Sequence, residues 1–202
     1  MCRWTSPWLR SNLARCERGV SAIEFALIAP VFLTLLLGTF DVGHTMYVRG
    51  ILSGAIQDAG RDAGLESGAN AVSAIDSYVA KQIKATAPQG AVLTTRKNYQ
   101  SFLDAGKPED FVDANANLVY DPEECFTDAN GNQQWDPDKG LSGQGGADDV
   151  VVYTATLTYD RIVPLGGFLG WDDTNTISAS TVLRNQPFAD QAARQEVQIC
   201  PN

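Results

Sequence analysis

The stretch RGVSAIEFALIAPVFLTLLLGTFD, residues 18–41, decides the fold. Residues 20–40 are almost wholly apolar, and a helix of that length spans about 31 Å, the thickness of a bilayer's hydrocarbon core. A cleaved signal peptide is the alternative, but its apolar core is usually about 7–15 residues and a small-residue cleavage site follows it. The longer run, with no such site behind it, predicts a membrane-spanning helix.

The charges around this run predict its orientation. Arg3, Arg10, Arg15 and Arg18 precede it, whereas Asp41 follows it directly. Positively charged flanks stay on the cytoplasmic side of a membrane. The sequence therefore predicts a basic cytoplasmic leader over residues 1–19, a transmembrane helix over 20–40 and a periplasmic body over 41–202.

Glu24 is unexpected inside an apolar helix, because a carboxylate in a bilayer costs a few kcal/mol and usually has a partner or a task. One explanation is that its side chain extends to the lipid headgroups. The other is that the chain is cut after Gly19, so that the new amine of Val20 on a neighbouring subunit pairs with Glu24. Both explanations stay open at this point.

These residues carry a family resemblance. Gly19 followed by VSAIE and Phe25 resembles a type IV prepilin processing site, and residues 18–60 resemble TadE-like pseudopilins of Tad/Flp pilus systems. The string ISASTVLRNQPF, residues 177–188, is similar to the tail of many such proteins. The resemblance implies a single-pass protein of the bacterial inner membrane, with the extracellular pilus as the other location. It also implies cleavage by a prepilin peptidase between Gly19 and Val20, at a processing site that includes Glu24 and Phe25. Other pseudopilin subunits would be partners, and the role would be a minor one in pilus biogenesis, adhesion and biofilm formation.

Composition excludes several function classes. The net charge is −9, and the leader carries +3, so the remainder carries −12. Nucleic-acid binding requires clustered Lys and Arg, and we expect none. His44 is the single histidine, which leaves too few residues for a His-based catalytic site or a zinc site. We expect neither an enzyme nor a small-molecule substrate.

The body reads as α+β. Apolar residues at helical spacing continue the membrane helix as an amphipathic helix, a second helix is expected over 69–86, and strands over 91–95, 150–160 and 176–183 predict a small antiparallel sheet. Phe168 and Trp171 would cap its core or form an exposed apolar tip. The apolar face of the helical extension comprises Val48, Leu52, Ala55, Ile56, Ala59 and Ala63.

Glycines recur every four residues along the helical extension, at Gly50 and Gly54 and at Gly60, Gly64 and Gly68. Small residues on one side of a helix allow close approach of a neighbour. A weak, frayed helix is the alternative, because glycine lowers helix stability.

An acidic insert over 104–149 contains a duplication with a 15-residue period. Oxygen donors at positions 1, 3, 5, 9 and 12, with a carbonyl at position 7, suit a calcium ion. The second copy has Lys139 at position 12, so Asp138, Asp148 or Asp149 would supply its last ligand. The alternative to calcium binding is a solvated loop rich in turns. The expected ligands are Asp113, Asn115, Asn117, Val119, Asp121 and Glu124 in the first loop, and Asp128, Asn130, Asn132 and Asp136 in the second.

The four cysteines divide between the two sides of the predicted membrane helix. Cys2 and Cys16 precede it, and Cys125 and Cys200 follow it. In an oxidising compartment Cys125 and Cys200 can form a disulfide, or they can remain two thiols. The sequence thus favours a Tad-type pseudopilin with a calcium-binding insert; the alternative is a signal-anchored calcium-binding surface protein unrelated to pili.

Overall fold

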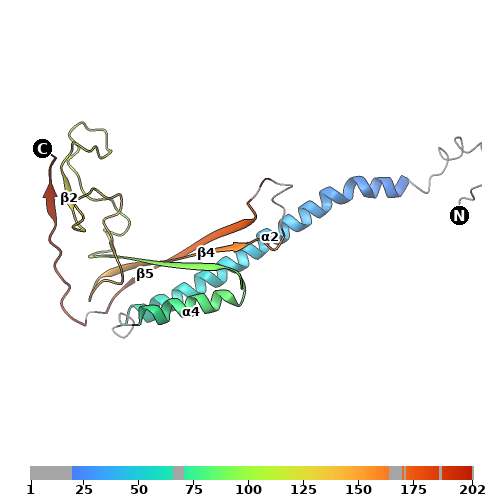
Figure 1. The fold of residues 1–202 in the computed structure, drawn as a ribbon, viewed down its shortest axis with the longest axis horizontal. Helices are drawn as coiled ribbons and strands as arrows, with labels where there is room; N and C mark the ends of the chain where they lie inside the picture. The colour runs from blue at the N-terminus through green and yellow to red at the C-terminus, as the bar shows by residue number, and fades with distance from the viewer. Residues whose placement is uncertain (1–19, 66–70, 164–169, 171, 187, 202) are drawn as a thin grey trace, which may run out of the picture.

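The computed structural model describes residues 20–65, 71–163, 170, 172–186 and 188–201. Helix α2 (Val20–Ala63) comes first, and its N-terminal half projects from the rest of the molecule (Figure 1). Helix α4 (Val72–Lys84) follows. The strands are β1 (Ala91–Tyr99), β2 (Phe126–Asp128), β3 (Leu141–Ser142), β4 (Val150–Asp160), β5 (Thr174–Arg184) and β6 (Val197–Ile199).

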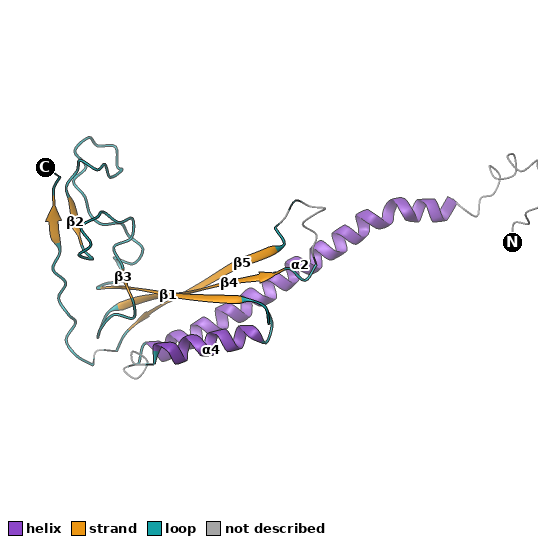
Figure 2. Ribbon diagram, viewed as in Figure 1, coloured by secondary structure: helices purple, strands orange, loops and turns teal. Residues whose placement is uncertain are grey.

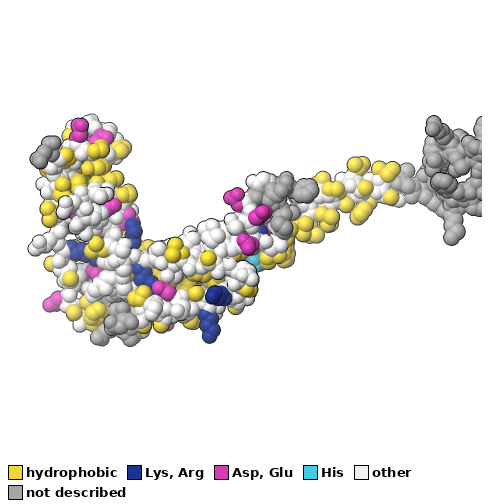
Figure 3. Space-filling view, viewed as in Figure 1, with side chains coloured by type: hydrophobic (Ala, Val, Ile, Leu, Met, Phe, Trp, Pro, Cys, Tyr) yellow, Lys and Arg dark blue, Asp and Glu magenta, His cyan; other side chains and the backbone are white. Residues whose placement is uncertain are grey.

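Helix α2 has two halves with different surroundings. The first half is apolar and exposed, and hydrophobic side chains cover it where it leaves the body (Figure 3). It is the one helix in the described part of the chain that is long and apolar enough to cross a membrane. The second half buries its apolar face, from Val48 to Ala63, against the body. The predicted continuation of the anchor as an amphipathic helix is confirmed.

Four antiparallel strands form the main sheet in the order β3-β1-β4-β5. Strand β4 pairs along its length with both neighbours, with Leu157 opposite Val92 and Ile177. Alternate residues of β4, including Tyr153 and Leu157, are fully buried, as the alternating sequence predicts. The α+β class and the long strands are therefore confirmed.

Both helices lie on one face of this sheet (Figure 2). The core joins the buried face of α2 to Ile75, Val79 and Ile83 of α4 and to Tyr153, Ala155, Leu157 and Tyr159 of β4. Gly60 and Gly64 allow α2 to approach β5 closely. A Cβ atom at Gly60 would lie 2.7 Å from Thr181 Cγ2, and one at Gly64 would lie 3.3 Å from the Arg184 carbonyl oxygen. Close packing explains these two glycines, whereas Gly50 and Gly54 have open space around them.

A smaller module lies at the end of the molecule far from the projecting helix (Figure 1). It contains the acidic insert and the C-terminal strand β6, which pairs with β2 in a two-stranded antiparallel sheet. The Cys125–Cys200 disulfide joins these strands across 75 residues of sequence. This second sheet is absent from the sequence-based expectation, because neither strand exceeds three residues. Phe168 and Trp171, expected at the sheet's end or tip, lie outside the described residues.

Candidate functional site

The predicted processing site lies at the start of the projecting helix. Glu24 and Phe25 are exposed in the first turns of α2, and Gly19 lies outside the described residues. Within the described ranges Glu24 has no hydrogen-bond or ion-pair partner in the isolated chain. Its exposure, in a run of apolar and equally exposed side chains, places a carboxylate on a surface that otherwise suits lipid.

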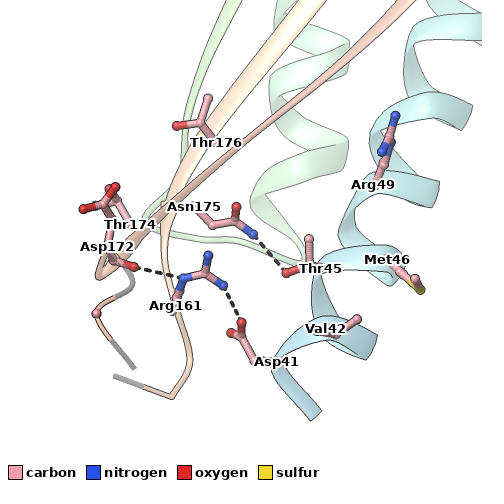
Figure 4. Close-up of a pocket in the computed structure, with 11 residues that line it drawn as sticks. Asp41, Val42, Thr45, Met46, Arg49, Arg161, Asp172, Thr174, Asn175 and Thr176 are labelled. Atoms are coloured by element: carbon pink, nitrogen blue, oxygen red, sulfur yellow. Dashed lines mark hydrogen bonds and ion pairs between the residues drawn. The ribbon is translucent and has the colours of Figure 1, made fainter. Parts of the chain in front are cut away.

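An ion pair fixes the point at which α2 leaves the body (Figure 4). Asp41, whose side chain is 4% exposed, pairs with Arg161 at the end of β4, and Arg161 Nε also donates to the Asp172 carbonyl oxygen at 3.0 Å. Next to it, Asn175 Nδ2 donates to Thr45 Oγ1 at 2.9 Å. These contacts border a hollow of about 740 Å³. They join the first polar turn after the apolar segment to the end of β4 and the start of β5.

The two acidic loops have the same hydrogen bonds at equivalent positions. Asp113 Oδ2 accepts from the Leu118 amide at 2.8 Å, and Asp128 Oδ2 accepts from the Gln133 amide at the same distance. In each loop the two asparagine side chains donate to the second aspartate, Asp121 or Asp136. The repeated sequence thus specifies a repeated loop conformation.

The backbone of the two loops also matches. Ala116 and Leu118 have positive φ, and so do Gly131 and Gln133, their equivalents 15 residues later. Position 6, where Leu118 replaces the usual glycine of calcium loops, therefore adopts the left-handed conformation without glycine. This departure from the expected pattern does not prevent the turn.

A glutamate that sequence reasoning missed closes the second loop. Glu124 accepts hydrogen bonds from the amides of Ala114 and Asp121 at 2.8 and 3.1 Å. Glu109 accepts from the amides of Ala129 and Asp136 at 2.8 and 3.1 Å, the equivalent pair in the second loop. Glu109 precedes the first loop, so each loop is closed by the glutamate at the start of the other repeat.

The residues expected near position 12 of the second loop have other partners. Lys139 Nζ lies 2.8 Å from Asp104, and Asp138 bonds to Lys97 at 2.7 Å and to Tyr99. Asp148 pairs with Arg184 and Asp149 with Arg194. In this conformation each of the three aspartates compensates a cation elsewhere, whereas Glu109 holds the position equivalent to that of Glu124.

Paired aromatic side chains connect the loops. Tyr120 and Trp135 occupy equivalent positions and stack with ring centroids 4.7 Å apart, and Phe111 and Phe126 pack edge-on against the stack. The Val112 amide donates to the Cys125 carbonyl, and the equivalent Thr127 amide donates to the Asp110 carbonyl. The module therefore has approximate twofold symmetry around a small aromatic core.

Three buried carboxylates in the loops form no ion pair with a cationic side chain of the described residues. Glu109, Glu124 and Asp128 are 1%, 5% and 3% exposed. Among the described residues none of the three has an ion-pair partner, whereas the other two buried carboxylates, Asp41 and Asp149, each pair with an arginine. No group of three or more His, Cys, Asp or Glu side chains in the described ranges is close enough to hold a metal ion in this conformation. Backbone amides occupy the carboxylate oxygens instead.

Comparison with known proteins concerns the N-terminal segment. The family model of TadE-like proteins matches residues 19–61. Neither the curated proteins nor the solved structures contain a match to the chain. The matched residues cover the start of α2, its apolar half and nearly all of its buried half. Over residues 19–61 the chain is thus similar to TadE-like proteins, which confirms the resemblance of its N-terminal sequence.

Proposed function

We propose that the protein is a pseudopilin, a minor pilin-like subunit that takes part in building a Tad/Flp-type adhesive pilus. Its N-terminus lies in the cytoplasm, α2 crosses the inner membrane once, and the body lies in the periplasm before the subunit joins the pilus. The observation that carries the proposal is one helix of 44 residues that is apolar and exposed at its start and is part of the body's core at its end. The match to TadE-like proteins over the same helix supports it.

Glu24 has a defined task in this proposal. A prepilin peptidase cuts between Gly19 and Val20, which removes the basic leader and creates an amine at Val20. The exposed Glu24 of one subunit then pairs with the Val20 amine of a neighbour, so that two charges in an apolar environment compensate each other. The pilus machinery and the other pseudopilins are the partners that this arrangement requires.

The intact mass of the protein recovered from its native membrane tests the proposal. We expect a mature chain that lacks residues 1–19 and begins at Val20. A mature protein that still carries the leader would favour the alternative, a signal-anchored calcium-binding surface protein unrelated to pili.

We also propose that the two acidic loops each bind a calcium ion. The buried carboxylates of Glu109, Glu124 and Asp128 support this, because buried charges normally have a counter-ion and these have none among the described residues. The ligands are those expected from the sequence, with the Val119 carbonyl in the first loop and Glu109 added to the second. Calcium would hold together a module whose own core is four aromatic side chains.

Calorimetric titration of the full chain with calcium tests this second proposal. We expect two ions per chain, with dissociation constants on the order of 10⁻⁴–10⁻³ M, as for extracellular calcium modules. Asp113→Ala and Glu124→Ala should each reduce the number of bound ions from two to one. Glu123→Ala, a change at the exposed neighbouring acid, should leave both ions bound. Absence of binding at millimolar calcium would refute the proposal.

A further inference from the structure

The hollow where α2 leaves the body lies at the level of the lipid headgroups in a chain anchored by α2. Its lining includes Asp41, which directly follows the apolar run, and extends along α2 to Arg49. At about 1.5 Å per residue the helix rises about 12 Å between these two positions. The headgroup layer is about 5–7 Å thick on each side of the hydrocarbon core, so the hollow opens within this layer and just outside it. Lipid headgroups are therefore the molecules most concentrated around it.

One face of α2 lines the hollow with apolar side chains that end at a cation. Val42 and Met46, about one helical turn apart, are 47% and 70% exposed. Arg49 follows on the same face and is also exposed. A long basic side chain at the end of an apolar surface keeps its charge in the polar layer of the membrane, where the lipid phosphates lie. This face of α2 thus matches the boundary between acyl chains and phosphates.

The opposite side of the hollow carries a carboxylate and hydroxyl groups. Figure 4 shows Asp172, which precedes β5, across the hollow from Arg49. Asp172 is exposed, and Thr174 and Thr176 of β5 add hydroxyl groups to the lining. Among the described residues the side chains of Arg49 and Asp172 have no hydrogen-bond or ion-pair partner. One charge of each sign is therefore available to a ligand.

The charges of the lining select a ligand that carries both signs. Asp41 and Arg161 compensate each other. A simple anion would compensate Arg49 and leave Asp172 without a partner, whereas a metal cation would do the reverse. A ligand with a phosphate and a primary ammonium group compensates both. The volume of the hollow, about 740 Å³, is within the range of sites for small molecules.

We propose that the hollow binds the phosphoethanolamine headgroup of a membrane lipid, with the phosphate at Arg49 and the ammonium at Asp172. The acyl chains then lie beside Val42 and Met46 and continue along the exposed apolar half of α2. The bound lipid holds the start of β5 at the membrane surface. The inference rests on the membrane anchoring proposed above.

Native mass spectrometry of the full-length chain, purified in detergent, tests the inference. The probes are phosphatidylethanolamine, phosphatidylcholine and phosphatidylglycerol with the same acyl chains, added in equal amounts. We expect at least about tenfold more bound phosphatidylethanolamine than either of the others, the effect of one charge-assisted hydrogen bond. The quaternary ammonium of phosphatidylcholine has no N–H to donate to Asp172, and phosphatidylglycerol has no cation. Equal retention of the three lipids, or a preference for either of the other two, would overturn the inference.

Matched variants locate the bound lipid. Arg49→Gln and Asp172→Asn should each reduce the retained phosphatidylethanolamine at least about tenfold. Arg61→Gln and Asp173→Asn, which change exposed residues outside the lining, should leave it unchanged. The melting temperature without added lipid should be the same for all four variants, since each replaces an exposed side chain. Loss of the lipid in a control variant, or its retention in Arg49→Gln or Asp172→Asn, would contradict the proposed site.

A soluble ligand and a failure of anchoring give different results. If free phosphoethanolamine at the concentration of the lipid prevents lipid binding, the site recognises a soluble compound and the lipid assignment is wrong. A protein absent from the membrane fraction contradicts the proposed anchoring, whereas an anchored protein without the lipid preference contradicts only the present inference.

Discussion

Glu109→Ala should destabilise the smaller module, which contains the acidic insert and β6, by about 3 kcal/mol. The Glu109 carboxylate is 1% exposed and accepts hydrogen bonds from two backbone amides in the second loop. Alanine leaves both partly buried amides without an acceptor, and each such loss costs about 1–3 kcal/mol. Urea unfolding, followed by the fluorescence of Trp135 after Trp4, Trp8 and Trp171 are changed to Phe, measures the effect. Trp135 reports on the site directly, because its Nε1 donates to the Glu109 carbonyl oxygen.

The exchange of glutamates between the loops makes this prediction specific. Glu109→Ala should abolish calcium binding in the second loop, although Glu109 lies outside that loop in the sequence. Glu124→Ala should affect the first loop in the same way, whereas the exposed Glu123→Ala should change neither stability nor binding. If Glu109→Ala behaved like Glu123→Ala, the closing role of Glu109 would be disproved.

Local sequence patterns predicted the elements that depend on local periodicity. The apolar face from Val48 to Ala63 repeats at helical spacing, and β4 alternates along its whole length, so both elements and their buried faces were evident. Each pattern follows from one secondary structure packed against one core. The orientation of α2 was predicted from the arginines that precede it, which periodicity alone does not supply, and it stays a prediction.

Contacts between distant parts of the chain were not predictable in this way. The loop pattern places the ligand of position 12 after Asp128, because a calcium loop normally supplies its own ligands. The duplication in fact begins four residues before Asp113, where Glu109 and Phe111 match Glu124 and Phe126. That signal was present in the sequence, but only the fold shows that the two glutamates exchange loops. The Asp41–Arg161 pair joins residues 120 apart, and nothing in the sequence near Asp41 indicates its partner.

A second cluster of buried polar groups surrounds Arg96, and its loss is expected to have a large effect on stability. Arg96, with its side chain 6% exposed, forms two hydrogen bonds to Asp76 at 2.8 and 3.0 Å. Its guanidinium lies 4.0 Å from the centre of the Tyr153 ring, and the Tyr153 hydroxyl donates to Asp76 at 2.7 Å. This cluster connects α4, β1 and β4 at the centre of the body.

Asp76→Ala should destabilise the body by about 3–5 kcal/mol, because it leaves the Arg96 charge buried without a partner. Asp58→Ala, at an exposed position of α2, is the control and should have little effect. Thermal unfolding at pH 7 measures both. Similar melting temperatures for the two variants would show that Tyr153 and solvent suffice to stabilise Arg96.

The pH dependence of the same variant distinguishes loss of the ion pair from loss of packing. Burial alone would raise the pKa of Asp76, but hydrogen bonds from Arg96 and Tyr153 and the charge of Arg96 lower this pKa below its usual 3.8. A carboxyl with a lowered pKa stabilises the fold above the unfolded value, and that stability is lost as the pH falls through the folded value. The wild-type protein should therefore lose stability below about pH 4 more steeply than Asp76→Ala. Asp104 and Asp138, whose pKa values are also lowered, keep part of the acid dependence in both proteins. Parallel curves for the two proteins would mean that Asp76 acts through packing, since a packing defect lowers stability equally at every pH.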